Sequence, residues 1–136
     1  GRHVGPFDAH VTVPAPIEWI NKSELTVLDR AAGVTFTWST PATPQRILLG
    51  AAATDQTTKA ASGFFCVVPG GTGRFTVPPN ILAHMPPTVD LELKKGGAGL
   101  IFGTLPADDI TKFTASGIDQ GQIFYGLLGT TLVQVK

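Results

Sequence analysis

Cysteine and charge are both scarce in this chain of 136 residues. Cys66 is the only cysteine, so no disulfide can form within the chain. It lies in the apolar run Gly63–Val68, where a small buried hydrophobe is expected rather than a reactive thiol. Charged residues make up 15% of the sequence, against about a quarter in most soluble domains.

The charges that are present balance to a formal net charge of zero. Proteins that bind nucleic acids usually carry a basic surplus or a basic stripe, because phosphate contacts dominate their affinity. Here the ten basic residues are scattered, and Lys94-Lys95 is their one adjacent pair. The sequence therefore predicts no nucleic-acid partner and leaves a neutral ligand such as a sugar open.

Long apolar runs and an export signal are also lacking. No stretch approaches the roughly 20 apolar residues that a membrane-spanning helix needs, so no membrane span is expected. The chain opens on Gly1-Arg2 rather than methionine, which predicts a processed piece of a longer precursor.

Groupings of the residue types that carry chemistry are missing as well. The histidines His3, His10 and His84 show no metal-ligand spacing. No serine lies in a Gly-x-Ser-x-Gly turn, and no acidic residues follow the spacing of a calcium loop. Gly70–Arg74 lacks the ending of a phosphate loop and is expected to be a hairpin turn. The sequence predicts that the protein is not an enzyme and has no cofactor, catalytic residue or metal site.

Threonine, serine, glycine, proline and alanine take the place of charge. This mixture disfavours helices and favours strands joined by turns. Strand-like runs recur at short intervals, with 16 glycines and 11 prolines spread between them. We therefore predict an all-β fold, an Ig-like antiparallel β-sandwich. No repeat or linker divides the chain, so residues 1–136 are expected to form a single domain.

The clearest expected strand is Gly33–Ser39, in which Val34, Phe36 and Trp38 alternate with polar residues. Ile47 and Leu49 are expected to point inward from the strand that follows. The apolar run at 63–68 predicts a strand buried on both faces. The other strands or short apolar pieces expected in this half are 8–13, 17–20, 24–28, 45–51 and 74–77.

One short helical turn is expected near residues 80–85, because Pro78-Pro79 and Pro86-Pro87 bracket it. Residues 117–121 are expected to form a turn. Two final strands, 122–128 and 130–135, are expected to form a hairpin around Gly129. The remaining strands expected in this half are 88–94, 99–104 and 109–115.

Aromatic residues are the best candidates for a ligand-binding surface. Many β-sandwich modules hold sugars on exposed aromatic platforms, which would make this chain a carbohydrate-binding module. Trp38 alternates with threonine and serine and is expected in the core. Trp19 and Tyr125 are the aromatics that could be exposed and functional, and the ligand-binding residues are otherwise unknown.

The order of the sequence features resembles an uncharacterised C-terminal domain of secreted acidobacterial (Solibacter-type) proteins. The resemblance covers about the last nine-tenths of the chain. One departure is Ser39-Thr40, where those domains have Gly-Gly. The segments that carry the resemblance are 16–21, 33–38, 64–66, 73–78, 81–86 and 113–121.

The resemblance implies export and a non-enzymatic role at the bacterial cell surface or outside the cell. The function expected first is an extracellular structural or interaction module, such as a building block of a surface or a filament. Its partners would be other domains or copies of the same protein. The alternative is the carbohydrate-binding module, with a sugar as partner.

Overall fold

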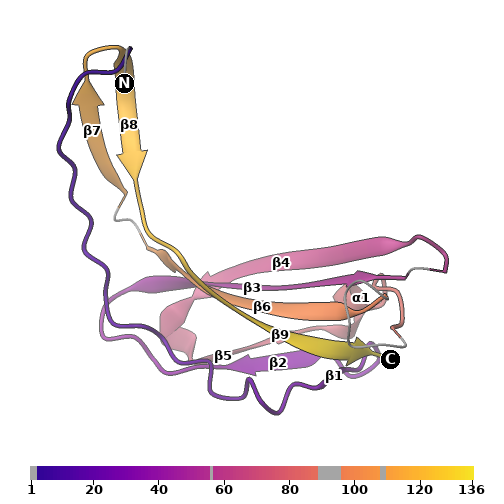
Figure 1. Ribbon diagram of the computed structural model, residues 1–136. Coiled ribbons are helices and arrows are strands. Elements are labelled where there is room, and N and C mark those ends of the chain that lie inside the picture. The colour runs from indigo at the N-terminus through magenta and orange to yellow at the C-terminus, as the bar shows by residue number, and fades with distance from the viewer. Residues whose placement is uncertain (1–2, 56, 89–95, 108–109) are drawn as a thin grey trace.

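The computed structural model describes residues 3–55, 57–88, 96–107 and 110–136 (Figure 1). Strands dominate, so the prediction of a β-rich fold is confirmed. The strands are β1 (Val27–Leu28), β2 (Val34–Thr37), β3 (Gln45–Thr54), β4 (Ala61–Pro69), β5 (Arg74–Val77), β6 (Ala98–Pro106), β7 (Thr111–Ala115), β8 (Ile118–Ile123) and β9 (Leu127–Val135). The helices within these residues are the 3₁₀ turn η1 (Gly70–Thr72) and α1 (Pro79–Leu82).

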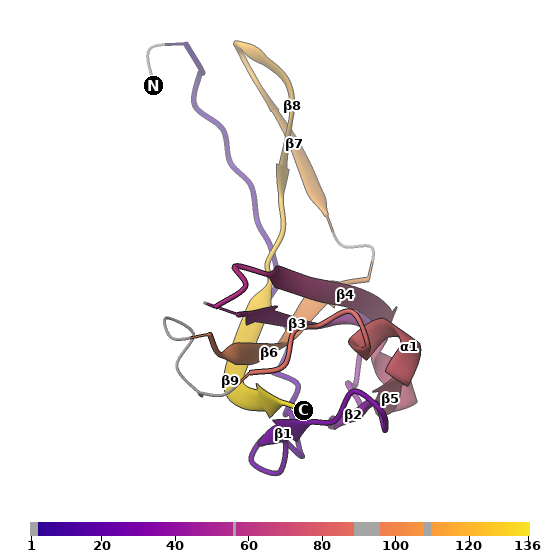
Figure 2. The same ribbon diagram turned by 90° about the vertical axis from the view of Figure 1, so that its right-hand side faces the viewer.

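Five strands form one sheet in the order β1-β9-β6-β3-β4. Neighbouring strands run antiparallel, except that β1 runs parallel to β9. The two views in Figures 1 and 2 show that this sheet curls, with β4 along one edge and β1 along the other. The other two pairs, β2–β5 and β7–β8, form separate antiparallel ladders.

The β2–β5 pair covers the inner face of the curled sheet and encloses the core with it (Figure 2). Its side chains alternate as predicted, since Val34 and Phe36 are buried while Thr35 meets Thr76 on the other face. A bridge between Trp19 and Trp38 extends this layer by one segment. The largest fully buried side chains are Phe36, Leu28, Ile47, Leu49, Leu82, Leu100, Val77, Val133 and Val135.

The short helix α1 lies where the prolines predicted a helical turn. Pro79 stands at its start, where a fixed φ and a missing N–H cost nothing. Ala83 N donates a hydrogen bond to Pro79 O over 2.8 Å and ends the turn. Leu82 is fully buried, so this single turn closes the core beside β5. The predicted turn is therefore present, one residue earlier and shorter than 80–85.

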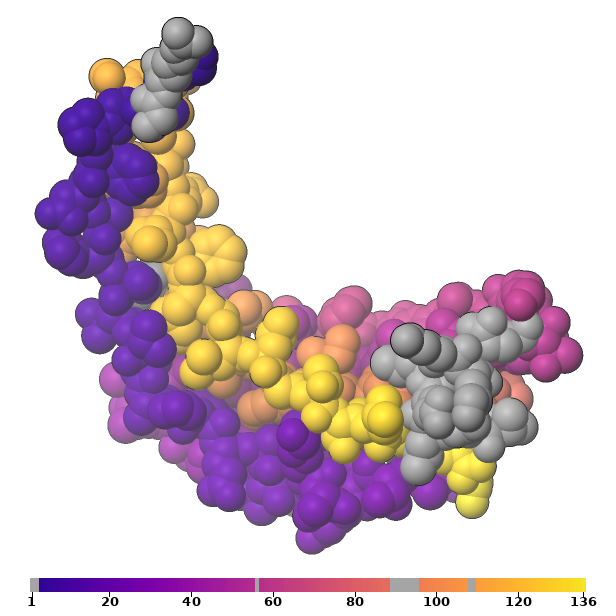
Figure 3. Space-filling view, in the orientation of Figure 1, coloured from indigo at the N-terminus to yellow at the C-terminus, as the bar shows by residue number. Residues whose placement is uncertain are grey.

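The hairpin β7–β8 stands away from the sheet as an arm (Figures 1 and 3). We define the arm as residues 110–126. Thr104 on β6 lies opposite Leu127 on β9, so the arm belongs to the connection between two strands that pair with each other. The molecule consequently has the outline of an L in Figure 3, with the arm as the short limb.

The N-terminal residues 3–16 run beside the arm rather than within the sheet (Figure 1). Gly5 N donates a hydrogen bond to Ser116 O over 2.8 Å, and the Phe7 ring stacks on Phe113 with centroids 4.2 Å apart. The prediction of a strand at residues 8–13 is therefore wrong. This segment is extended, but it makes too few ladder hydrogen bonds with the arm to form one.

Two turn predictions near the C-terminus are wrong. β9 runs straight through Gly129, which pairs with Phe102 of β6 instead of turning the chain. The break falls at residues 124–126. Asp119 lies within β8, and the tight turn is at Ser116-Gly117, where Gly117 has a φ of +89°.

The prediction that 63–68 is buried on both faces is also wrong. β4 is the edge strand beyond β3, and alternate residues along it are exposed. Phe64 and Cys66 pack against the core, whereas Phe65 and Val67 face outward. An unbroken apolar run predicts burial on both faces only when something covers the second face.

Part of one predicted strand, 88–94, lies outside the described residues. Its first residue, Thr88, is buried and accepts a hydrogen bond from Val135 N over 2.9 Å. Within the part of the chain that the structure describes, no helix has the length and apolar character needed to cross a membrane.

Candidate functional site

The two tryptophans lie in the core. Trp19 is 8% exposed and Trp38 is 2% exposed. The Trp19 ring stacks against Phe36 and Phe102, with centroid distances of 5.6 and 5.4 Å. The sequence left Trp19 open as an aromatic that could be exposed; it is buried, and neither tryptophan can serve as a sugar platform. Tyr125 is half-buried at the base of the arm.

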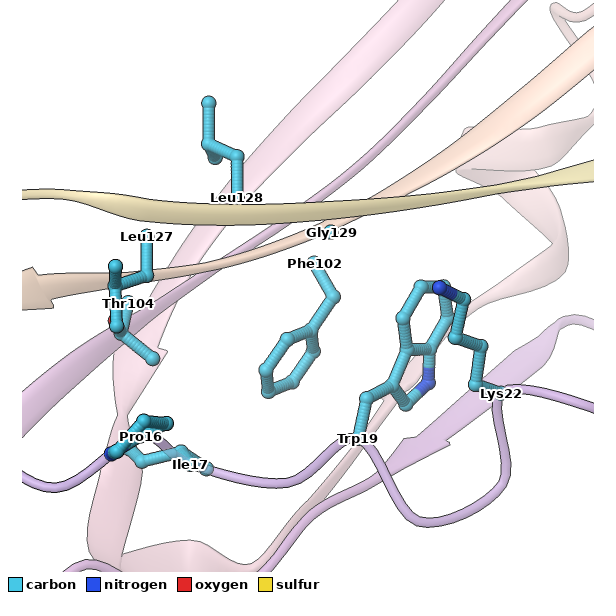
Figure 4. A pocket seen from close by; sticks show the side chains of 9 residues that line it. All are labelled: Pro16, Ile17, Trp19, Lys22, Phe102, Thr104, Leu127, Leu128 and Gly129. Atoms are coloured by element: carbon cyan, nitrogen blue, oxygen red, sulfur yellow. The ribbon is translucent and has the colours of Figure 1, made fainter.

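A hollow of about 280 Å³ lies beside this aromatic stack, between residues 16–22 and strands β6 and β9 (Figure 4). Trp19 and Phe102 form much of its apolar wall, and Lys22 Nζ lies 6.0 Å from the Trp19 ring centroid. Trp19 Nε1 and Thr104 Oγ1 are buried without a hydrogen-bond partner among the described residues. Lys22 is the only ionisable residue among the described residues that line the hollow.

The histidines do not meet one another or form a metal site. His10 Nε2 lies 3.2 Å from Asp8 Oδ1, and both side chains are almost fully exposed on the N-terminal segment. His3 is exposed near the tip of the arm, and His84 is exposed after α1. Among the described residues, no three His, Cys, Asp or Glu side chains come close enough to hold a metal ion.

Asp55 has a structural role at the end of β3. Its carboxylate accepts hydrogen bonds from the Thr58 hydroxyl at 2.7 Å and from Thr57 N at 2.8 Å. These bonds hold the pKa of the carboxyl below its usual value, because they favour the charged form. The bonds cap the loop that joins β3 to β4, and they do not indicate a binding site.

Cys66 faces the core side of β4, opposite Leu49, and is half-buried. Burial raises the pKa of the thiol, because the thiolate loses solvation. At any pH below that pKa, a smaller fraction of the thiol is therefore ionised than in an exposed cysteine.

We expect Cys66 to react with an aromatic disulfide reagent at pH 8 several-fold more slowly than an exposed cysteine. The matched control places the one thiol at Leu132, an exposed position, in a Cys66→Ala/Leu132→Cys variant. The measurement is the rate of thiolate release by absorbance. Equal rates in the two proteins would show that Cys66 is neither shielded nor raised in pKa.

The most distinctive surface is the outer face of the five-stranded sheet. We define the outer face as the side chains of β3, β4, β6 and β9 that point away from the core. Arg46 is its one charged member. Phe65 and Leu128 are 65% and 69% exposed, and they are large apolar residues. The large apolar members are Leu48, Phe65, Val67, Ile101, Leu105, Leu128 and Leu132.

Glycines in the neighbouring strands make the outer face flat. Leu128 lies over Gly103, where an added Cβ would come within 2.5 Å of Leu128 Cδ2. Phe65 lies over Gly50 in the same way, since an added Cβ there would approach the ring to 2.7 Å. The large side chains thus lie down across the sheet instead of standing out from it.

The arm and the segment beside it have no core of their own. No described residue between 3 and 16 or between 110 and 126 is buried. A lone two-stranded hairpin is marginally stable in water. The Phe7 ring of the N-terminal segment stacks on Phe113 of the arm. The arm therefore gains little stability from the body, and its surface is largely exposed.

A second hollow, of about 290 Å³, lies where the base of the arm meets the outer face. Val67 and Leu105 come from the sheet, and Ile110 and Phe124 come from the arm. Their apolar side chains continue the surface of the outer face up to the arm. Figure 3 shows the concave corner of the L in which this junction lies.

Comparisons with known proteins do not assign a family to this surface. No protein-family model, no curated protein and no solved structure matches the chain. The argument about function therefore depends on the outer face and the arm.

The sequence did contain a signal for the outer face. Along β4, large apolar residues point to both faces of the sheet: Phe65 and Val67 to one face, and Phe64 and Val68 to the other. The glycines Gly50 and Gly103 fall on the matching side of β3 and β6. Only the strand order shows that these positions lie side by side.

Proposed function

We propose that the chain is a non-enzymatic structural or interaction module with an Ig-like sandwich arrangement. In this proposal it serves as an exported building block of a surface or a filament, and binds other domains or copies of itself through the outer face. The observation that carries the proposal is the flat outer face, with one charged side chain among its described members.

An exposed apolar sheet face favours association because its side chains leave water when a partner covers them. The gain is roughly 25 cal/mol for each Å² of apolar surface buried. Contiguous apolar patches larger than a few hundred Å² are rare on monomeric proteins and mark interaction sites. Phe65, Val67, Leu128 and Leu132 each expose about half of their surface or more, which makes this face such a patch.

The total surface of the chain supports the same conclusion. Its accessible area is 8347 Å² for a mass of 14.2 kDa. A compact monomer of this mass exposes about 6,800 Å². The excess of about 1,600 Å² is about twice the roughly 800 Å² that a standard protein–protein interface removes from each partner. Association could therefore cover the arm and the outer face without exposing the core.

We expect the purified chain to associate as its concentration rises, and Leu128→Lys to weaken that association at least about tenfold. A lysine there would place an unpaired charge in the interface, which costs more than the roughly 1.4 kcal/mol that a factor of ten represents. Sedimentation velocity over a range of concentrations measures the effect. Leu128 is exposed, so the variant should fold normally.

The matched control is Ala31→Lys, which adds the same charge to an exposed position in the turn after β1, away from both the outer face and the arm. This variant should associate like the unmodified chain. A chain that stays monomeric at millimolar concentration would contradict the building-block role, and equal weakening by both lysines would show that general charge, not the outer face, controls association.

A further inference from the structure

The edge strand β4 is open along its length. It pairs with β3 through nine residues, and it has no second neighbour among the described strands. Its sequence from Ala61 to Pro69 contains no charged residue. The opposite edge of the sheet differs, because β1 is only two residues long.

Open edge strands are usually protected, because their unpaired N–H and C=O groups attract other strands. The common protections are charged side chains, prolines, bulges and short length. β4 has one of these, Pro69 at its last position, and its ladder with β3 runs from Arg46 to Thr54 without a register shift. A long, regular and uncharged edge is suited to strand addition.

We propose that β4 pairs antiparallel with β4 of a second copy, with Phe65 on the two-fold axis. This inference adds a contact along the edge of the sheet to the outer face described above, and it rests on the proposed function. Phe65 is the central residue of the nine, so the two strands overlap completely in this register. The two sheets would then form one sheet of ten strands.

The side chains of β4 are complementary in this register. Residues that face each other across the axis have numbers that add to 130. Gly63 therefore faces Val67 of the second copy, which places a large side chain against an empty position on the outer face. Ala61 faces Pro69 of the second copy, so the missing N–H of the proline falls at the end of the ladder. Two Phe65 rings meet at the centre, and cross-strand aromatic pairs of this kind stabilise sheets.

A second copy fits better than a charged partner for two reasons. The chain has a formal net charge of zero, so two copies do not repel each other at long range. Arg46 is the only charged side chain among the described residues of this edge and the outer face, and it already interacts with another residue of the chain. These surfaces therefore offer little to a charged partner. Strand pairing would also bring Phe65 and Val67 of both copies into one continuous apolar ridge.

Disulfide trapping tests the register directly. The variant Phe65→Cys/Cys66→Ala carries one thiol on the proposed axis, where directly opposite Cβ atoms lie about 4.5–5.5 Å apart, close to the range that a disulfide bridges after a small adjustment. Mild oxidation should convert most of it to a covalent dimer, read by non-reducing electrophoresis. The control, Ala31→Cys/Cys66→Ala, has an exposed thiol in the turn after β1, away from both this edge and the outer face, and should stay largely uncrosslinked.

The second measurement is the association of Phe65→Lys by sedimentation velocity, with near-ultraviolet circular dichroism to confirm that the tryptophan core is intact. A lysine at the centre of an edge strand opposes pairing, so at least a tenfold weaker association is expected. Rapid crosslinking at position 65 alone, together with this weakening, supports the β4 pairing.

Other outcomes separate the two proposals. If the unmodified chain associates but Phe65→Cys crosslinks no faster than Ala31→Cys, β4 pairing is overturned and the building-block role stands. If Phe65→Lys associates like the unmodified chain, the pairing is overturned as well. If the unmodified chain does not associate at any concentration, both proposals fail.

Discussion

Replacement of Phe36 by alanine is expected to lower the free energy of unfolding by about 3–5 kcal/mol. The Phe36 side chain is fully buried, lies opposite Phe75 and packs against the Trp19 ring at 5.6 Å. Its removal loses the transfer free energy of a benzyl group and leaves a cavity between the two layers. Urea unfolding followed by tryptophan fluorescence measures the change.

The matched control is Phe124→Ala, which removes the same atoms from a side chain that is 59% exposed. It should change the stability by less than about 1 kcal/mol, because surface truncations seldom cost more. If Phe36→Ala does not fold, Phe36→Leu keeps more of the buried volume and allows the comparison. A small effect of both Phe36 variants would contradict the position of this side chain in the core.

The two tryptophans should respond differently to replacement by phenylalanine. Trp38 Nε1 donates a hydrogen bond to Gly70 O at 2.7 Å within the core. Trp19 Nε1 is buried and has no partner among the described residues. Both replacements remove a similar apolar area, but only Trp38→Phe removes a hydrogen bond, which leaves Gly70 O with the longer bond from Gly73 N at 3.3 Å. Trp38→Phe is therefore expected to cost about 0.5–1.5 kcal/mol more than Trp19→Phe.

Thermal or urea unfolding of both variants, with the unmodified chain in parallel, measures that difference. Each variant keeps one tryptophan, so fluorescence reports unfolding in both. Equal costs would show that the Trp38 hydrogen bond contributes nothing beyond the packing of the ring. A larger cost for Trp19→Phe would show that its stack with Phe102 matters more than that hydrogen bond.

Patterns among neighbouring residues correctly predicted those elements whose structure depends mainly on their own residues. β2 alternates between buried and exposed positions, and β5 occupies the residues 74–77 predicted for it. The prolines around α1 predicted a short helical turn because they prevent both a longer helix and a strand. In each of these elements, the backbone preferences of the residues and the spacing of the apolar side chains predict the same structure.

The errors lie where a residue's role depends on a distant neighbour. Gly129 is a residue type common in turns, but in β9 it is a regular position of the ladder opposite Phe102. Trp19 stands between polar and apolar neighbours in the sequence, and it is buried because the segment around it joins β2 by a bridge to Trp38. Neither contact can be read from adjacent residues.

The scarcity of charge and cysteine, the high content of threonine, glycine and proline, and the period of two in β2 were sufficient to predict a β-rich chain. These are properties of composition and of neighbouring residues, and they act through local backbone preference. The tertiary structure decided which apolar side chains remain exposed. β4 became an edge because β3 pairs with β6 on its other side, and that pairing left Phe65 and Val67 on a surface that no other described strand covers.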